Sequence, residues 1–156
     1  MSVKVNVAGC CNEPVWALNE DGMHVLQKPY MLSMDMVMQD GKNCIIDVNF
    51  FEGFCCDGLS VPWIFRWFLK SWDENNYLYN LAGALHDWLY ATEGNDHTFE
   101  REECDDIFRG LLREAGKSRG KAGVADKAVE WFAGGKAHWN NDDFGIRDKA
   151  ALTKRE

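Results

Sequence analysis

The chain has 156 residues, long enough for one domain with a sizeable buried core. Hydrophobic residues make up 46% of it and aromatic residues 13%, which excludes a disordered chain. Asp and Glu outnumber Lys and Arg by 25 to 17, giving a formal net charge of −8. We therefore expect no nucleic-acid partner, since a nucleic-acid groove needs clustered cations.

The first half of the chain shows the period-two alternation of β-strands. Residues 3–7 alternate between apolar and polar side chains, and Met34, Met36 and Met38 alternate around Asp35 and Val37. Asp40-Gly41 is a turn signal, and the mostly apolar residues 44–48 follow it. This pattern predicts a β-hairpin that turns near Asp40-Gly41, beside a strand near the N-terminus.

The second half shows helical periodicity. A short helix is expected after Pro62, a second over about 75–91, a third from an N-cap at Thr98 to about residue 115, and a fourth over about 120–138. The polar residues 147–156 are expected to form a frayed tail. The prediction is a single α+β domain over residues 1–146, in which a small N-terminal antiparallel sheet precedes a helical half of three to four helices.

Apolar runs and cysteines bear on where the protein works. No apolar run approaches the roughly 18–20 residues that span a bilayer, and the N-terminus lacks the apolar core of a signal peptide. Four of the six cysteines form two pairs of sequence neighbours, Cys10-Cys11 and Cys55-Cys56, and no CxxC motif occurs. We interpret the cysteines as reduced thiols in a cytoplasmic setting. A zinc site of Cys55, Cys56, Cys104 and His86 is an alternative, but the sequence spacing of these ligands differs from that of structural zinc sites.

The most informative segment is the predicted helix around His86 and Asp87. This helix is apolar almost all the way round, which is typical of a buried helix. Burying an imidazole and a carboxylate is costly unless they are paired, hydrogen-bonded or bound to a metal. The pair therefore indicates a functional site, whereas His86 considered alone would more often be a hydrogen-bonded core histidine.

The helix that follows supplies a carboxylate for His86. Its apolar stripe has Asp105 on the border and Asp106 on the solvated face. Asp105 is the carboxylate directed inward, where it could lie near His86. The alternative is an ordinary (i, i+4) ion pair of Asp105 with Arg101.

A second candidate is the segment from Asp57 to Pro62. A carboxylate and the Ser60 hydroxyl flank a glycine just before the predicted helix. They could contribute to the site, or Asp57 or Ser60 could simply cap that helix. Both interpretations stay open.

These segments resemble a family of phages and prophages known as domain of unknown function 1353. The matching features, from about Tyr30 to Trp139, are Gly53 to Pro62, His86-Asp87-Trp88-Leu89-Tyr90, Arg101 with Asp105 and Phe108, and Trp131 to Trp139. The chain departs from the family pattern at Cys56, Leu59 and Trp63, so only Asp57 and Ser60 keep an expected role in that loop. The resemblance implies a phage origin and no established activity.

The His-Asp-x-x-Tyr pattern also resembles the helix of phospholipases A2. That likeness implies that His86 deprotonates water, that Asp105 orients the imidazole, and that Asp87 ligates Ca²⁺. The glycine-rich calcium loop of that family has no counterpart here, except what Gly53 to Gly58 could provide.

The function expected from the sequence is a metal-dependent hydrolase acting on an ester or amide of the lipid or cell-wall class. His86, Asp105 and Ser60 are the expected catalytic residues, supported by Tyr90 and Arg101. Ca²⁺ or Zn²⁺ is the metal expected at Asp57 and Asp87. A rival hypothesis is a virion or tail accessory protein that binds other phage structural proteins, with a purely structural His-Asp pair. A third is a counter-defence protein that binds a host component. These hypotheses place the protein in the host cytoplasm or in the virion.

Overall fold

The computed structural model describes residues 2–5, 13–38, 40–58, 72–92, 98–116, 139, 141–142 and 144–156. These residues form two small antiparallel β-sheets and two α-helices, an α+β arrangement. The elements in chain order are β1 (Ser2–Val5), β2 (Trp16–Leu18), β3 (His24–Leu26), β4 (Tyr30–Val37), β5 (Asn43–Phe50), β6 (Cys55–Cys56), α1 (Tyr77–Ala91), α3 (Arg101–Gly116), the 3-10 turn η4 (Arg147–Lys149) and β7 (Ala150–Arg155).

The larger sheet has the strand order β1-β4-β5-β7, with antiparallel neighbours throughout. The hairpin predicted around Asp40-Gly41 joins β4 to β5, with Val37 opposite Asn43 and Met34 opposite Ile46. Gly41 has φ +81°, a left-handed conformation that glycine adopts without a Cβ penalty. The prediction of this hairpin is confirmed.

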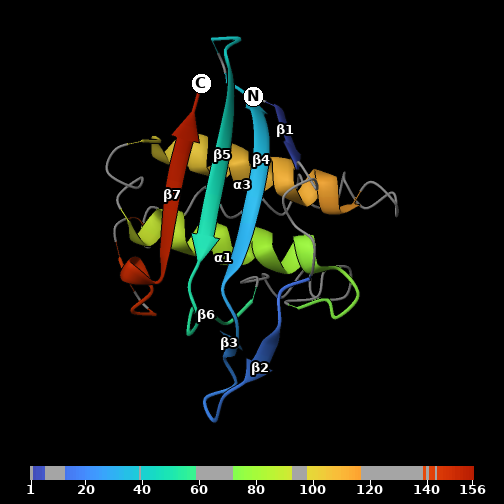
Figure 1. Cartoon of the computed structure of the whole chain (residues 1–156), viewed down its shortest axis with the longest axis vertical. Helices are drawn as coiled ribbons and strands as arrows, with labels where there is room; N and C mark the ends of the chain where they lie inside the picture. The colour runs from blue at the N-terminus through green and yellow to red at the C-terminus, as the bar shows by residue number, and fades with distance from the viewer. Residues whose placement is uncertain are drawn as a thin grey trace.

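Alternate residues of β4 and β5 bury one face of the larger sheet against the helices. This apolar face packs against α1 and α3, which cross behind the sheet in Figure 1. Its fully or almost fully buried side chains are Leu32, Met34, Met36, Cys44, Ile46, Val48 and Phe50. The period-two pattern read from the sequence therefore has its origin in one-sided burial.

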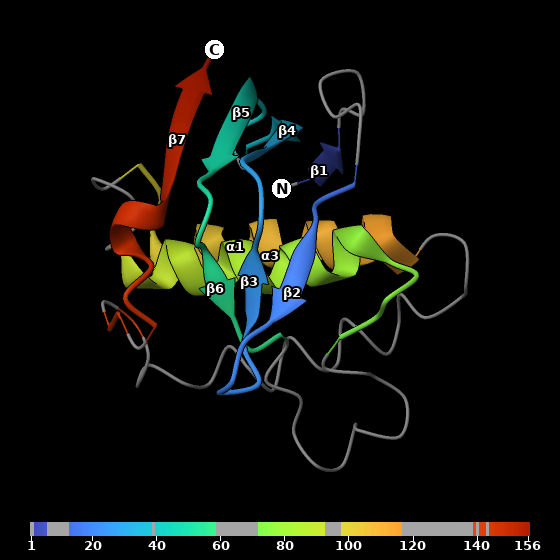
Figure 2. The same cartoon turned by 60° about the horizontal axis from the view of Figure 1, so that its bottom comes forward.

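Helix α1 is packed by other elements on several sides, which explains why its sequence is apolar almost all the way round. It packs beside α3 behind the larger sheet, and the smaller sheet, with strand order β2-β3-β6, lies in front of it in Figure 2. Its first turn is capped by Asn76, whose side chain accepts a hydrogen bond from the Tyr79 N–H at 3.2 Å. The prediction of a buried helix over about 75–91 is confirmed.

Helix α3 is amphipathic, as predicted, but it begins later than expected. The predicted stripe of Cys104, Ile107, Phe108, Leu111 and Ala115 is buried. The helix starts at Arg101, so the prediction of Thr98 as its N-cap is wrong. The Glu103 carboxylate instead accepts a hydrogen bond from the Glu100 N–H at 2.9 Å, which satisfies a backbone donor ahead of the helix.

The C-terminal residues form a strand of the larger sheet, which differs from the expected N-terminal sheet with a frayed tail. Strand β7 pairs with β5, with Ala150 opposite Phe50, so the sheet is not confined to the N-terminal half and this tail is not frayed. An edge strand keeps one edge and one face in water, which is why a polar sequence is compatible with strand pairing.

The smaller sheet and the helix count also differ from the sequence-based expectation. Strands β2 and β3 were not predicted, because three residues each are too few to show periodicity. The described ranges contain two α-helices rather than three to four, and the helices expected after Pro62 and over 120–138 fall outside those ranges. Neither of the two described helices is long and apolar enough to cross a membrane.

Candidate active site

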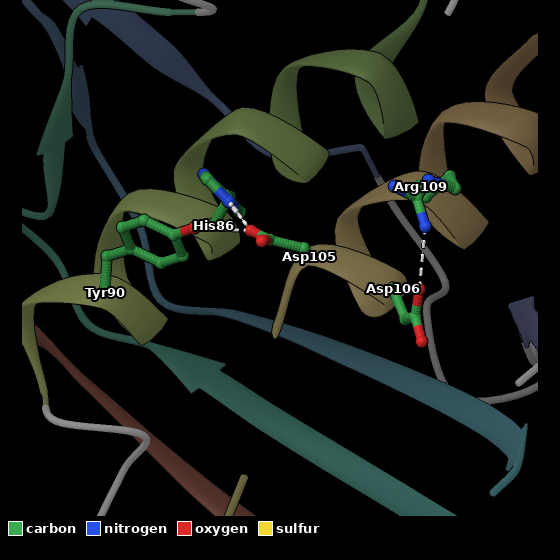
Figure 3. Close-up of polar contacts among 5 residues, drawn as sticks. All are labelled: His86, Tyr90, Asp105, Asp106 and Arg109. Atoms are coloured by element: carbon green, nitrogen blue, oxygen red, sulfur yellow. Dashed lines mark hydrogen bonds and ion pairs between the residues drawn. The ribbon is translucent and has the colours of Figure 1, made fainter. Parts of the chain in front are cut away.

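The strongest polar cluster joins α1 to α3 through one carboxylate oxygen. His86 Nε2 lies 3.0 Å from Asp105 Oδ1, and the Tyr90 hydroxyl donates to the same Oδ1 at 2.5 Å. Figure 3 shows both side chains of α1 converging on Asp105. The predicted proximity of His86 and Asp105 is therefore present.

Helix geometry explains why these three groups meet. His86 and Tyr90 are one turn apart on α1, so their side chains lie on the same face. That face packs against α3 where Asp105 borders the apolar stripe. The Asp105 side chain is only 9% exposed, whereas that of His86 is 16% exposed. The His86 side chain is therefore somewhat more exposed to solvent than the carboxylate that it contacts.

The hydrogen bonds outweigh the effect of burial on Asp105. Burial favours the neutral acid, but the hydrogen bonds from His86 and Tyr90, with the charges of His86 and Arg101, hold the pKa of Asp105 below its usual value. Asp105 is therefore ionised at neutral pH. Burial and the adjacent Asp105 carboxylate raise the pKa of Tyr90, which stays a hydroxyl donor.

An ionised Asp105 fixes the tautomer of a neutral His86. A carboxylate can only accept hydrogen bonds, so His86 Nε2 must carry the proton that points at Oδ1. The lone pair then lies on Nδ1, the ring nitrogen that does not face Asp105. In Figure 3 this second ring nitrogen points away from Asp105. The imidazole thus presents a basic nitrogen away from its carboxylate partner.

Aromatic rings pack around the imidazole. The Tyr90 ring centroid lies 4.2 Å and the Phe108 ring centroid 4.4 Å from that of His86, with tilts of 40° and 31°. Trp139 packs edge-on against Tyr90 at 5.0 Å. The sequence placed Phe108 in the core and gave no sign of the Trp139 contact, since neither contact leaves a local pattern in the chain.

The neighbouring carboxylate, Asp106, has a different environment. It pairs with Arg109 at 2.9 Å one turn along α3, and their side chains are 23% and 27% exposed. Figure 3 shows this pair directed away from His86. The sequence-based distinction between an inward Asp105 and a solvated Asp106 is therefore confirmed.

Asp57 and Asp87 both act electrostatically on the Cys56 thiol. Burial raises the pKa of the Cys56 thiol to about 12, and the charges of Asp87 and Asp57 add to this shift, so both lie near Cys56. Partial burial also raises the pKa of Asp57. Within the described ranges, no hydrogen bond or ion pair joins Asp57 to His86 or Asp105.

The remaining predicted groups can be placed only in part. Ser60 lies outside the described residues, and Arg101 contributes a positive charge near Asp105 and Tyr90. Cys44, Cys55, Cys56 and Cys104 are free thiols. Over the ranges that the structure describes, no three or more His, Cys, Asp or Glu side chains are grouped so that they could hold a metal ion. The described Asp57 and Asp87 therefore do not make up a metal centre by themselves.

A comparison with protein families matches residues 30–129 to the family described as a protein of unknown function (DUF1353). The match spans β4 through α3 and includes His86, Tyr90 and Asp105. The chain belongs to this family. No curated protein and no solved structure matches it. The description of the family names no activity.

Proposed function

We propose that this protein is a hydrolase in which His86 acts as the general base. The observation that carries the proposal is the shared hydrogen bonding of His86 and Tyr90 to the ionised Asp105. A buried carboxylate that holds one imidazole nitrogen leaves the other available as a base. The 16% exposure of the His86 side chain supports access by water.

The proposed reaction is attack of water on an ester or amide carbonyl. His86 Nδ1 takes a proton from the water as its oxygen bonds to the carbonyl carbon. Asp105 stabilises the imidazolium that forms, and Tyr90 keeps Asp105 in place. The imidazolium then returns the proton to the leaving alcohol or amine as the carbonyl–heteroatom bond breaks. A positioned base contributes roughly 10²–10⁴-fold to such a step.

Lipid and cell-wall components are the proposed substrate classes. The likeness of His86, Asp87 and Tyr90 to the phospholipase A2 helix supports the lipid class. A phage setting, in the host cytoplasm or the virion, belongs to the same proposal and rests on the family resemblance described from the sequence. Ser60 remains the proposed additional hydroxyl group.

A divalent ion, Ca²⁺ or Zn²⁺, remains a proposal at Asp57 and Asp87. The carboxylate oxygens suit Ca²⁺, but the described residues offer too few ligands to complete its coordination. The reaction above is therefore written through His86, Asp105 and Tyr90 alone. A bound ion would contribute by polarising the substrate carbonyl.

The test is a hydrolysis screen with a matched pair of variants. Purified protein is incubated with nitrophenyl esters of increasing acyl length, phospholipid vesicles and peptidoglycan, in Ca²⁺, in Zn²⁺ and in EDTA. We expect turnover of at least one class, a loss of about 100-fold or more in His86→Gln, and little change in Asp106→Asn. Absence of turnover throughout, with His86→Gln changing only stability, would favour the virion accessory role instead.

A further inference from the structure

We infer that Phe108 is a positioning residue for His86, a role that rests on the proposed function. Phe108 makes no hydrogen bond to the imidazole, and as a core residue it would need no role beyond packing. Its ring, however, lies against the imidazole with a centroid separation of 4.4 Å and a tilt of 31°. This is closer to stacking than to an edge-on contact.

Phe108 and Asp105 act from the same helix. They are three residues apart on α3, so both side chains project from the face that meets α1. Asp105 holds the imidazole edge through Nε2, but one hydrogen bond does not by itself fix the rotation of the ring about its Cβ–Cγ bond. The Phe108 ring, only 3% exposed, restricts that rotation.

Tyr90 completes the restraint from α1. Its ring packs on the imidazole at 4.2 Å while its hydroxyl holds Asp105 Oδ1. The imidazole is thus restrained by one hydrogen bond and two rings, and the hydrogen bond alone does not define its plane. Without Phe108, Nδ1 would sample several directions, and the hydrogen bond at Nε2 would open more often.

The inference predicts a spectroscopic change that loss of packing elsewhere would not produce. In ¹⁵N-histidine-labelled protein, at a pH where the ¹⁵N shifts show a neutral imidazole, the wild-type His86 ring should show the Nε2–H tautomer with a slowly exchanging Nε2 proton. His86 is assigned by the disappearance of its signals in His86→Gln. In Phe108→Leu and in Phe108→Met, which stay apolar but lack a flat ring, the Nε2 proton should exchange at least about tenfold faster.

Two further variants make the result decisive. Phe108→Tyr retains the ring and should retain the slow Nε2 proton. Phe99→Leu removes a ring that is also buried but is not among the described ring contacts of His86, and should leave the His86 signals unchanged. If folded Phe108→Leu and Phe108→Met both keep the wild-type exchange rate, or if Phe99→Leu changes it equally, Phe108 is only a core residue. This spectrum needs no substrate, so it is independent of whether the proposed hydrolysis is found.

Discussion

Tyr90 has two contacts with the site, and each predicts a separate consequence of its removal. Its hydroxyl donates to an ionised, buried carboxylate, and its ring packs on the imidazole. Hydrogen bonds to charged groups are worth more than neutral ones because the charge strengthens the electrostatic attraction. The substitution Tyr90→Phe separates the two contacts, since it keeps the ring.

We expect Tyr90→Phe to lower the free energy of unfolding by about 1.5–3 kcal/mol. Asp105 Oδ1 would keep only the hydrogen bond from His86, so this buried charged oxygen would lose one of its two donors. Urea denaturation at pH 7 measures the change. In an Asp105→Asn background the same substitution should cost less, because the charge is gone. An equal cost in both backgrounds would show that the hydroxyl does not act through the Asp105 charge.

Asp105 also predicts how stability depends on pH. Its pKa is lower in the folded protein than in the unfolded chain, where it is about 3.9. Its ionised form therefore stabilises the fold above about pH 4, and this contribution disappears as the pH falls through the lower, folded pKa. Asparagine cannot titrate, so Asp105→Asn should lose less stability than wild type as the pH falls from 5 toward 2.

Unfolding free energies measured across that range test the linkage. Asp106→Asn leaves the hydrogen bonds of Asp105 in place and should keep the Asp105 contribution. If Asp105→Asn and wild type lost stability in parallel, the hydrogen bonds to Asp105 would not favour its ionised form.

At the scale of elements, the site depends on how α1 is fixed against α3. Asn76 serves both helices, since its side chain caps α1 at the Tyr79 N–H and its Nδ2 donates to the Ala115 carbonyl at 3.0 Å. That carbonyl belongs to the last turn of α3, which has no partner within its own helix. One side chain therefore satisfies the start of one helix and the end of the other.

Asn76→Ala should lower the free energy of unfolding by about 1–2 kcal/mol. Asn75→Ala is the matched control, because Asn75 is exposed and precedes the cap, and it should have little effect. Thermal or urea denaturation compares the two. A similar effect of both substitutions would mean that the cap and the link to Ala115 contribute nothing specific.

The elements that the sequence predicted are those with long or repeated patterns. The β4–β5 hairpin, α1 and the core stripe of α3 each bury one or all faces over several turns or residue pairs, which imposes periodicity. Strands β2 and β3 are too short for periodicity, and β7 is polar because it lies at an edge. Its place beside β5 is set by tertiary pairing, which local sequence does not encode.

The same distinction applies to the site. The burial of Asp105 and the partial burial of His86 could be predicted because apolar residues surround them on two amphipathic or buried helices. The link of Tyr90 to Asp105 and the packing of Phe108 on His86 could not, since they depend on how α1 meets α3. The proximity of Asp87 to Cys56 likewise arises from the position of β6 against α1.

At the scale of the whole molecule, the C-terminal segment closes the fold around the site helix. Arg147 Nε donates to the Ala91 carbonyl at 2.9 Å, and Trp88 Nε1 donates to the Arg147 carbonyl at 3.1 Å. These bonds tie the end of α1 to η4, from which β7 enters the larger sheet. The family match ends at residue 129, so η4 and β7 lie outside the matched region, whereas Trp88 and Ala91 lie within it.

Removal of residues 150–156 should lower the free energy of unfolding by several kcal/mol, because β5 loses one of its two ladder partners and the buried Phe50 loses cover. Arg155→Gln is the comparison, since it removes only the exposed ion pair with Asp47 and should cost less than about 1 kcal/mol. Urea denaturation measures both. A truncated protein as stable as wild type would show that β7 is dispensable.

In the proposed hydrolase, Asp105 acts on catalysis through His86. A double-mutant cycle on the rate of hydrolysis measures this coupling. Rates are measured at neutral pH for wild type, His86→Gln, Asp105→Asn and the double variant, on an ester that the wild-type protein hydrolyses. Residues that act as one unit have non-additive effects. If Asp105 acts through His86, we expect the double variant to be no slower than His86→Gln alone. Losses that multiply in the double variant, or a His86→Gln rate equal to wild type, would contradict it.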